Sequence, residues 1–171
     1  MGDGIAFVVA DNVAASRDAA ELIDVDYEPL PAVVETGTAA RASATVWPER
    51  PDNIAFEHTA GNKDATDAAF EAASHIVTRD ITINRVAANS MEARAILASY
   101  DPAEDFHTIY LSAQSAFGMR RTLASVIFGE NLEKYRVITN DVGGAFGMKN
   151  SFYPEYALTV WATKQLGRPV K

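Results

Sequence analysis

The residues with the most unusual spacing form a glycine-rich stretch at positions 141–150, DVGGAFGMKN. Such a backbone lets a ligand approach closely, and its successive amides can cup an oxyanion or an oxo group. The spacing fits neither a phosphate-binding loop, because Met148 rather than glycine precedes Lys149, nor the G-x-G-x-x-G of dinucleotide folds. A tight turn with Phe146 filling the core is the structural alternative, and spacing alone does not decide between the two.

Three other polar residues invite a chemical interpretation. Gln114 stands between a predicted strand and a predicted helix, where its neutral amide can donate a hydrogen bond to a metal-bound oxygen. A helix cap or a solvated side chain is the alternative for this residue. Glu92 and Arg94 alternate with apolar residues, which predicts an ion pair on one face of a strand and hence a structural role.

The sequence does not predict a metal site built from protein side chains alone. Cysteine is absent, and no two of His58, His75 and His107 stand at the spacing of a helical metal pair. Metal chemistry would therefore use histidine or carboxylate ligands, or a cofactor that brings its own ligands.

Composition places the chain among globular proteins and limits its partners. Of 171 residues, 48% are hydrophobic and 22% charged, and the net charge is 15 − 23 = −8. This charge disfavours binding to nucleic acid or to an anionic membrane surface. The longest apolar runs, 5–10 and 157–162, are far shorter than the ~20 residues of a membrane span. We expect no signal peptide and a cytoplasmic location.

The elements that must position these residues are mixed rather than regularly alternating, which predicts an α+β fold. The first ~35 residues predict a strand, a helix and a second strand. The second strand ends at position 28, because the prolines that follow cannot continue a strand's hydrogen-bond ladder. Gly, Ala, Thr and Pro then predict a connecting segment. The later elements are predicted by apolar periodicity and by glycine stops. The predicted strands are 5–10, 24–28, 74–84, 93–99, 107–112 and 135–138, and the predicted helices are 13–23, 65–73, 115–128 and 153–166.

Taken together, the motifs resemble a segment of the molybdenum-binding large subunit of the xanthine dehydrogenase, aldehyde oxidase and carbon monoxide dehydrogenase family. Four motifs support this resemblance. NSMEAR at 89–94 is similar to the family's N-x-M-E-P-R, and SAQ at 112–114 to its S-T-Q. GGAFGMK at 143–149 is similar to the family's G-G-G-F-G-x-K, and GRPVK at 167–171 matches its G-R-P-V-K. The resemblance implies the end of an α/β-hammerhead domain at 1–37, a linker at 38–57, and the first part of a molybdopterin-binding domain at 58–171.

The resemblance also implies a cofactor and its binding residues. The cofactor is molybdopterin, whose dithiolene supplies sulfur ligands, so that no cysteine is needed. Gln114 would hydrogen-bond the apical oxygen on molybdenum, and Phe146 and Asn150 would lie at the substrate. The glycine-rich loop would contact the cofactor through Gly143, Gly144, Ala145, Phe146 and Gly147, with the amides of the last three facing the metal oxygens or the pterin.

Four departures from the family pattern refine this expectation. Asn150 replaces the glutamate of the purine oxidases, which favours aldehyde oxidase or carbon monoxide dehydrogenase relatives. Ala145 replaces a third glycine and Ala93 a proline. Family large subunits are several times longer and carry the catalytic glutamate near their far C-terminus, so we expect no catalytic residue here and a segment inactive by itself.

Its expected partners are the remainder of the large subunit and iron–sulfur and FAD subunits, in a homo-oligomeric complex. One alternative is a truncated, non-catalytic relative that acts only in subunit association. Another is an unrelated α+β domain with a chance loop, which predicts Phe146 buried away from Gln114.

Overall fold

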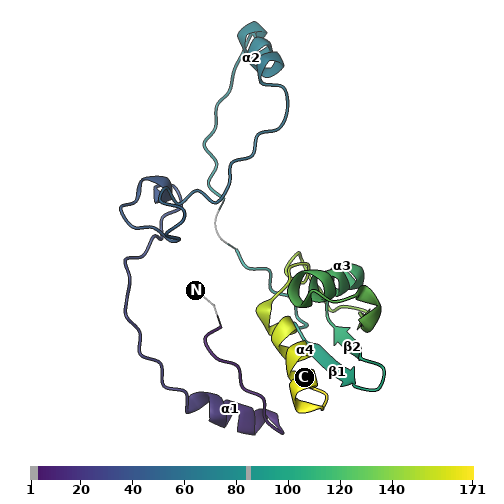
Figure 1. The fold of residues 1–171 in the computed structure, drawn as a ribbon. Coiled ribbons are helices and arrows are strands. Elements are labelled where there is room, and N and C mark those ends of the chain that lie inside the picture. The colour runs from purple at the N-terminus through teal and green to yellow at the C-terminus, as the bar shows by residue number, and fades with distance from the viewer. Residues whose placement is uncertain (1–3, 84–85) are drawn as a thin grey trace. The chain divides into compact units, whose positions relative to one another are not determined.

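A computed structural model describes residues 4–83 and 86–171 of the chain (Figure 1). The chain divides into two compact units, one of Met1–Asp24 with Asn84–Lys171 and one of Val25–Ile83. No helix in the described part of the chain is both long and apolar enough to cross a bilayer.

The first unit is built on a three-stranded sheet in the order β1-β2-β3. Strands β1 (Ile96–Asp101) and β2 (Phe106–Leu111) form an antiparallel hairpin, whereas β3 (Tyr135–Ile138) runs parallel to β2. A parallel neighbour requires a crossover connection. Here α3 (Ala116–Arg121) continues into the π-helical η2 (Thr122–Phe128), and the short η3 (Leu132–Lys134) then leads into β3.

Local capping signals explain where the helices around the sheet begin and end. The Ser115 hydroxyl accepts the Gly118 amide at the start of α3, and Gly129 ends η2 with a left-handed φ of 64°. Helix α4 (Pro154–Leu166) begins with proline, whose missing N–H is not needed there, and ends at Gly167 with φ 62°. The predicted helices at 115–128 and 153–166 and the predicted strand at 135–138 are confirmed.

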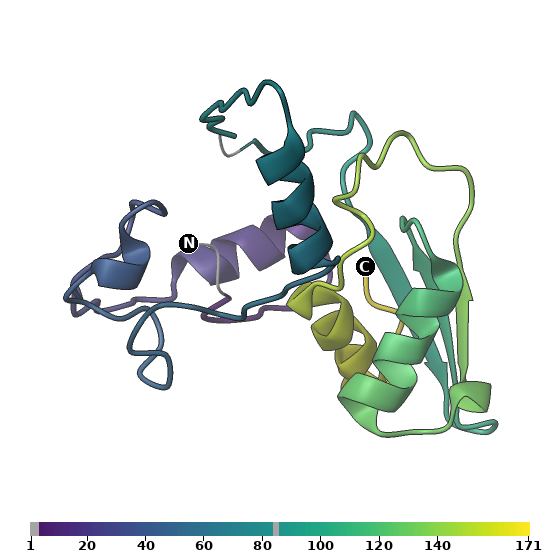
Figure 2. The ribbon, with the colours of Figure 1, turned by 90° about the horizontal axis from the view of Figure 1, so that it is seen from above.

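Both long helices pack on one face of the sheet, α4 on β1 and α3 against β3 (Figure 2). Alternate residues of β1 and β2 point to that face, so Ala98, Ile109 and Leu111 are buried. They meet helix side chains such as Leu123 and Val160, which are fully buried. The opposite face keeps its side chains partly in solvent.

Two further helices agree with the predictions to within a few residues. Helix α1 (Val13–Glu21) begins where the Asn12 side chain accepts the Ala15 amide, and α2 (Lys63–Ala72) begins in the same way at Asn62. The second unit also contains the short η1 (Ala39–Arg41).

Three predicted strands, 5–10, 24–28 and 74–84, are wrong as far as the structure describes them. Asn84, the last residue of the third, lies outside the described residues. These segments are extended but have no strand partner within residues 4–83 and 86–171. A strand needs a neighbour for its N–H and C=O groups, and periodicity does not reveal whether one exists. Ile81 and Ile83 accordingly remain 81% and 90% exposed. The α+β class holds for the mixture of helices and sheet, while the hammerhead assignment stays a prediction.

Candidate functional site

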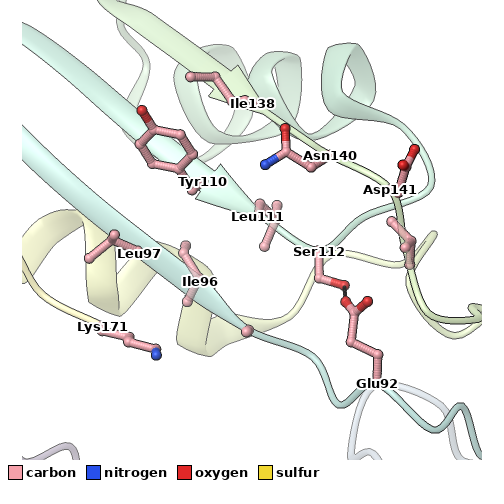
Figure 3. A pocket seen from close by; sticks show the side chains of 12 residues that line it. Glu92, Ile96, Leu97, Tyr110, Leu111, Ser112, Ile138, Asn140, Asp141 and Lys171 are labelled. Carbon is pink, nitrogen blue, oxygen red and sulfur yellow. Dashed lines mark hydrogen bonds between the residues drawn. The ribbon is translucent and has the colours of Figure 1, made fainter.

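The candidate site lies at the end of the sheet where β2 finishes and the glycine-rich loop follows β3. A groove of about 390 Å³ opens there beside the segment that enters β1 (Figure 3). Its wall combines apolar side chains of the open sheet face, among them Leu97, Tyr110 and Ile138, with polar ones that include Glu92, Asn140 and Asp141. The groove is therefore apolar on the sheet side and polar on the loop side.

The Glu92 carboxylate accepts several hydrogen bonds on this polar side of the groove. One oxygen accepts hydrogen bonds from the Ser112 hydroxyl and from Nζ of Lys149, the latter at 3.1 Å. The other oxygen accepts the Gly143 amide, while the Glu92 amide donates to the Gly143 carbonyl at 3.2 Å. One side chain thus joins three segments that are far apart in sequence.

These donors set the ionisation of Glu92. The hydrogen bond from Ser112, followed by those from the Gly143 amide and Lys149, lowers the pKa of Glu92 from 4.5 to about 2, although burial opposes the shift. All three favour the charged form because they donate to the carboxylate. Glu92 is therefore a fixed anion at neutral pH rather than a general base.

The predicted ion pair between Glu92 and Arg94 is wrong. Glu92 pairs with Lys149, whereas Arg94 pairs with Glu155 at 2.8 Å and lies 3.6 Å over the ring of Tyr153. The segment 86–95 is not a strand, so the alternation of its side chains does not place the two residues on one face. Sequence reasoning missed the role of Lys149, which lies in the same loop as the glycines but pairs 57 residues away.

The glycine-rich loop presents its aromatic residue to solvent. Phe146 is 76% exposed and has a left-handed φ of 50°. The alternative in which Phe146 fills the core is therefore wrong. The alternative of an unrelated domain with a chance loop also predicted a buried Phe146, and this exposure contradicts that prediction. Gly144 and Gly147, with φ of 91° and 89°, supply the neighbouring turns that a side chain would strain. Within the described residues, the amides of Ala145, Phe146 and Gly147 donate no hydrogen bond.

Gln114 is tied to the same loop. Its backbone amide donates to the Lys149 carbonyl at 3.1 Å, and its side chain is exposed. Ser115, not Gln114, caps the following helix, so the capping interpretation of Gln114 is wrong. Asn150 is exposed in the last turn of the loop, with its amide donating to the Gly147 carbonyl at 3.2 Å.

The histidines stand apart from this site. His107 is buried on β2, with its ring 4.7 Å from that of Tyr100 and 4.8 Å from that of Tyr135, and burial lowers its pKa. His58 and His75 are exposed in the other unit. Among the described residues, no three His, Asp or Glu side chains come together as metal ligands.

Comparison with known proteins gives a consistent result. Residues 46–171 match the model of the molybdopterin cofactor-binding domain. The chain is 33% identical to the carbon monoxide dehydrogenase large chain of Hydrogenophaga pseudoflava, covering 98% of this chain and 22% of that protein. It is 34% identical to the nicotine 6-hydroxylase large subunit of Paenarthrobacter nicotinovorans, covering 100% and 21%.

Solved structures show the same likeness. The crystal structure of a Cu,Mo-CO dehydrogenase superposes with a TM-score of 0.77 at 32% identity, covering 95% of this chain and 22% of that one. Quinoline 2-oxidoreductase from Pseudomonas putida 86 gives the same TM-score at 28% identity, covering 94% and 20%. The chain spans about a fifth of the length of the relatives it matches. It belongs to the family of molybdenum hydroxylase large subunits and carries a molybdopterin cofactor-binding domain.

Proposed function

We propose that the chain contributes one wall of the cofactor and substrate site of a molybdenum hydroxylase of the aldehyde oxidase or carbon monoxide dehydrogenase type. The residues that would hold the cofactor are Gln114 and the loop residues Gly143, Gly144, Ala145, Phe146 and Gly147. Phe146 and Asn150 would border the substrate. The remainder of a large subunit, together with iron–sulfur and FAD subunits, would complete the enzyme.

The observation that carries this proposal is the run of three amides, Ala145 to Gly147, that donate no hydrogen bond within the described residues. The three residues lie at or near the surface, so a bound acceptor can reach backbone donors that no group of the described chain occupies. Successive N–H groups around a left-handed residue form an anion-binding concavity, and Phe146 provides that conformation. The loop therefore fits the oxo and pterin groups of molybdopterin.

The chain's own residues would bind and orient rather than exchange protons. When bound, the cofactor supplies two-electron oxidation of a small substrate with water as the oxygen source. The amides of the loop and the side chain of Gln114 would fix its position, since both are neutral donors whose charge does not change. The exposed ring of Phe146 would limit the space beside it and exclude water from the substrate.

Metal and pterin analysis of the full chain tests the proposal. The chain is co-expressed with the remainder of a family large subunit, in molybdate-supplemented culture of a host that makes molybdopterin, and molybdenum and pterin are measured per chain after the complex is purified. We expect both near one per chain, with a large loss in Gln114→Ala. Gln165→Ala, an exposed glutamine on α4, is the matched control and keeps the wild-type content.

Absence of molybdenum and pterin from the wild-type chain would overturn the proposal. It would support a relative that acts only in subunit association. Equal molybdenum content in Gln114→Ala and wild type would instead remove Gln114 from the cofactor site.

A further inference from the structure

The contacts of Glu92 connect all the segments to which the cofactor residues belong. Its carboxylate holds Ser112, two residues before Gln114, and it holds both ends of the glycine-rich stretch at Gly143 and Lys149. The Lys149 carbonyl in turn accepts the Gln114 amide. The chain of contacts closes on itself, so no one segment can shift without breaking a bond to another.

Lys149 supplies the one ion pair among these contacts of Glu92. Its side chain is fully buried, and within the described residues Glu92 is the one carboxylate at ion-pair distance from it. A buried ammonium needs a partner that offsets its lost hydration. The lysine therefore anchors the loop to Glu92 instead of offering its charge to a ligand.

The close fit at Gly143 shows that the two segments are in direct contact. A Cβ atom at this position would lie 2.7 Å from Cβ of Glu92 and 3.0 Å from its Oε2. Carbon atoms not bonded to each other normally stay about 3.5–4.0 Å apart. Only glycine allows the carboxylate to reach the loop amide in this arrangement.

We propose that Glu92 is a positioning residue that sets the geometry of the glycine-rich loop and of Gln114 through its contacts with Lys149 and Gly143. This inference rests on the proposed function, because it assigns Glu92 to the support of the same cofactor site. Glu92 itself is not proposed to touch the cofactor.

The test measures loop order in the full chain purified without cofactor. Amide exchange is followed by NMR at Gln114 and Met148, whose amides donate to the carbonyls of Lys149 and Ala145 and not to Glu92. We expect exchange at both amides to rise at least tenfold in Glu92→Gln and in Lys149→Met. The amide of Ile109 in the sheet reports whether the unit stays folded.

A matched control removes an ion pair elsewhere in the same unit. Lys134→Gln breaks the pair with Asp105 at the β1–β2 turn and should leave exchange at Gln114 and Met148 unchanged. If either single variant fails to fold, the double variant Glu92→Gln with Lys149→Met leaves no unpaired buried charge and carries the test. Where one single variant does not fold, the double variant should still exchange faster than wild type at both amides. Where both single variants fold, coupling predicts that exchange in the double variant rises by less than the product of the two single effects.

A pH profile separates positioning by the charged carboxylate from a role of its shape alone. The charged groups around Glu92 are Lys149 from the loop and, along the groove, Asp141 and Lys171. In the wild type, exchange at Met148 relative to Ile109 should rise as pH falls from about 4.5 to about 2. In Glu92→Gln the ratio should stay flat, because the neutral amide does not titrate.

The outcomes distinguish the two proposals. Unchanged exchange at Gln114 and Met148 in both single variants overturns the positioning role, whatever the cofactor content. Raised exchange supports it even if the wild-type chain binds no molybdenum, a result that would overturn the proposed function alone.

Discussion

Replacing Gly143 with alanine isolates the contact between the loop and Glu92. The backbone of Gly143 lies outside the left-handed region, so alanine strains no dihedral, and its effect on the folded state comes from the contacts of its methyl group. This group would lie 2.7 Å from Cβ of Glu92, about 1 Å inside an ordinary carbon contact. Both Cβ atoms are fixed to backbone, so the two segments must separate. Overpacking of this kind costs about 1–3 kcal/mol.

The net effect is smaller because alanine also restricts the unfolded chain, which returns about 0.4–1 kcal/mol. We therefore expect Gly143→Ala to lower the free energy of unfolding by about 1–2 kcal/mol. Urea denaturation followed by circular dichroism measures this as a lower midpoint at unchanged slope. Exchange at the Gln114 amide should rise in the same variant, since the loop moves away from Glu92.

A second glycine provides the control for this substitution. A Cβ at Gly37 would meet nothing within 4 Å, and its φ also lies outside the left-handed region. Gly37→Ala should leave the free energy of unfolding unchanged or raise it by up to about 1 kcal/mol, because only the restriction of the unfolded chain remains. Wild-type stability and wild-type exchange at Gln114 in Gly143→Ala would refute the close contact on which the reasoning depends.

Three further predictions follow from single positions. Phe146→Gly should leave stability unchanged or raise it by up to about 1 kcal/mol in urea denaturation, because the ring is exposed and glycine relieves the left-handed φ; a loss above about 2 kcal/mol would show a packed ring. Hydrogen bonds from Lys134 and then Tyr100 lower the pKa of Asp105 from 3.8 to about 2, so its stabilising contribution, complete above pH 3.8, should disappear as pH falls through about 2. Urea midpoints across that range should fall less steeply in Asp105→Asn, and an equal slope would exclude Asp105 as the cause. Leu123→Ala, at a fully buried position under the sheet, should cost about 2–5 kcal/mol, and a cost below about 1 kcal/mol would contradict the packing.

Sequence reasoning succeeded where the determinants are local. Ser115 starts one helix through its own hydroxyl, and Gly129 and Gly167 end two helices through their own backbone conformation. Such signals act within a few residues, so they can be read without knowing the fold. The change from α-helix to π-helix after Arg121 had no comparable signal and was not predicted.

Prediction from sequence failed where a structural feature depends on a partner that is distant in sequence. The segment 5–10 has the composition of a strand, but a strand exists only when another strand pairs with it. In the same way, Glu92 and Lys149 stand in two separate motifs, and nothing in their spacing links them. The motifs identified which loops matter, whereas the contacts among those loops required the structure.

The burial of Lys149 changes how the glycine-rich loop can act on a ligand. In a phosphate-binding loop the lysine faces the ligand and adds a full positive charge. Here the ammonium is fully buried against Glu92, so the exposed surface of the loop offers neutral N–H groups beside an aromatic ring. Neutral donors suit acceptors of low charge better than polyphosphates, whose binding needs compensating cations. The geometry of Lys149 thus separates this loop from the nucleotide-binding loops that its glycines superficially resemble, independently of any comparison with other proteins.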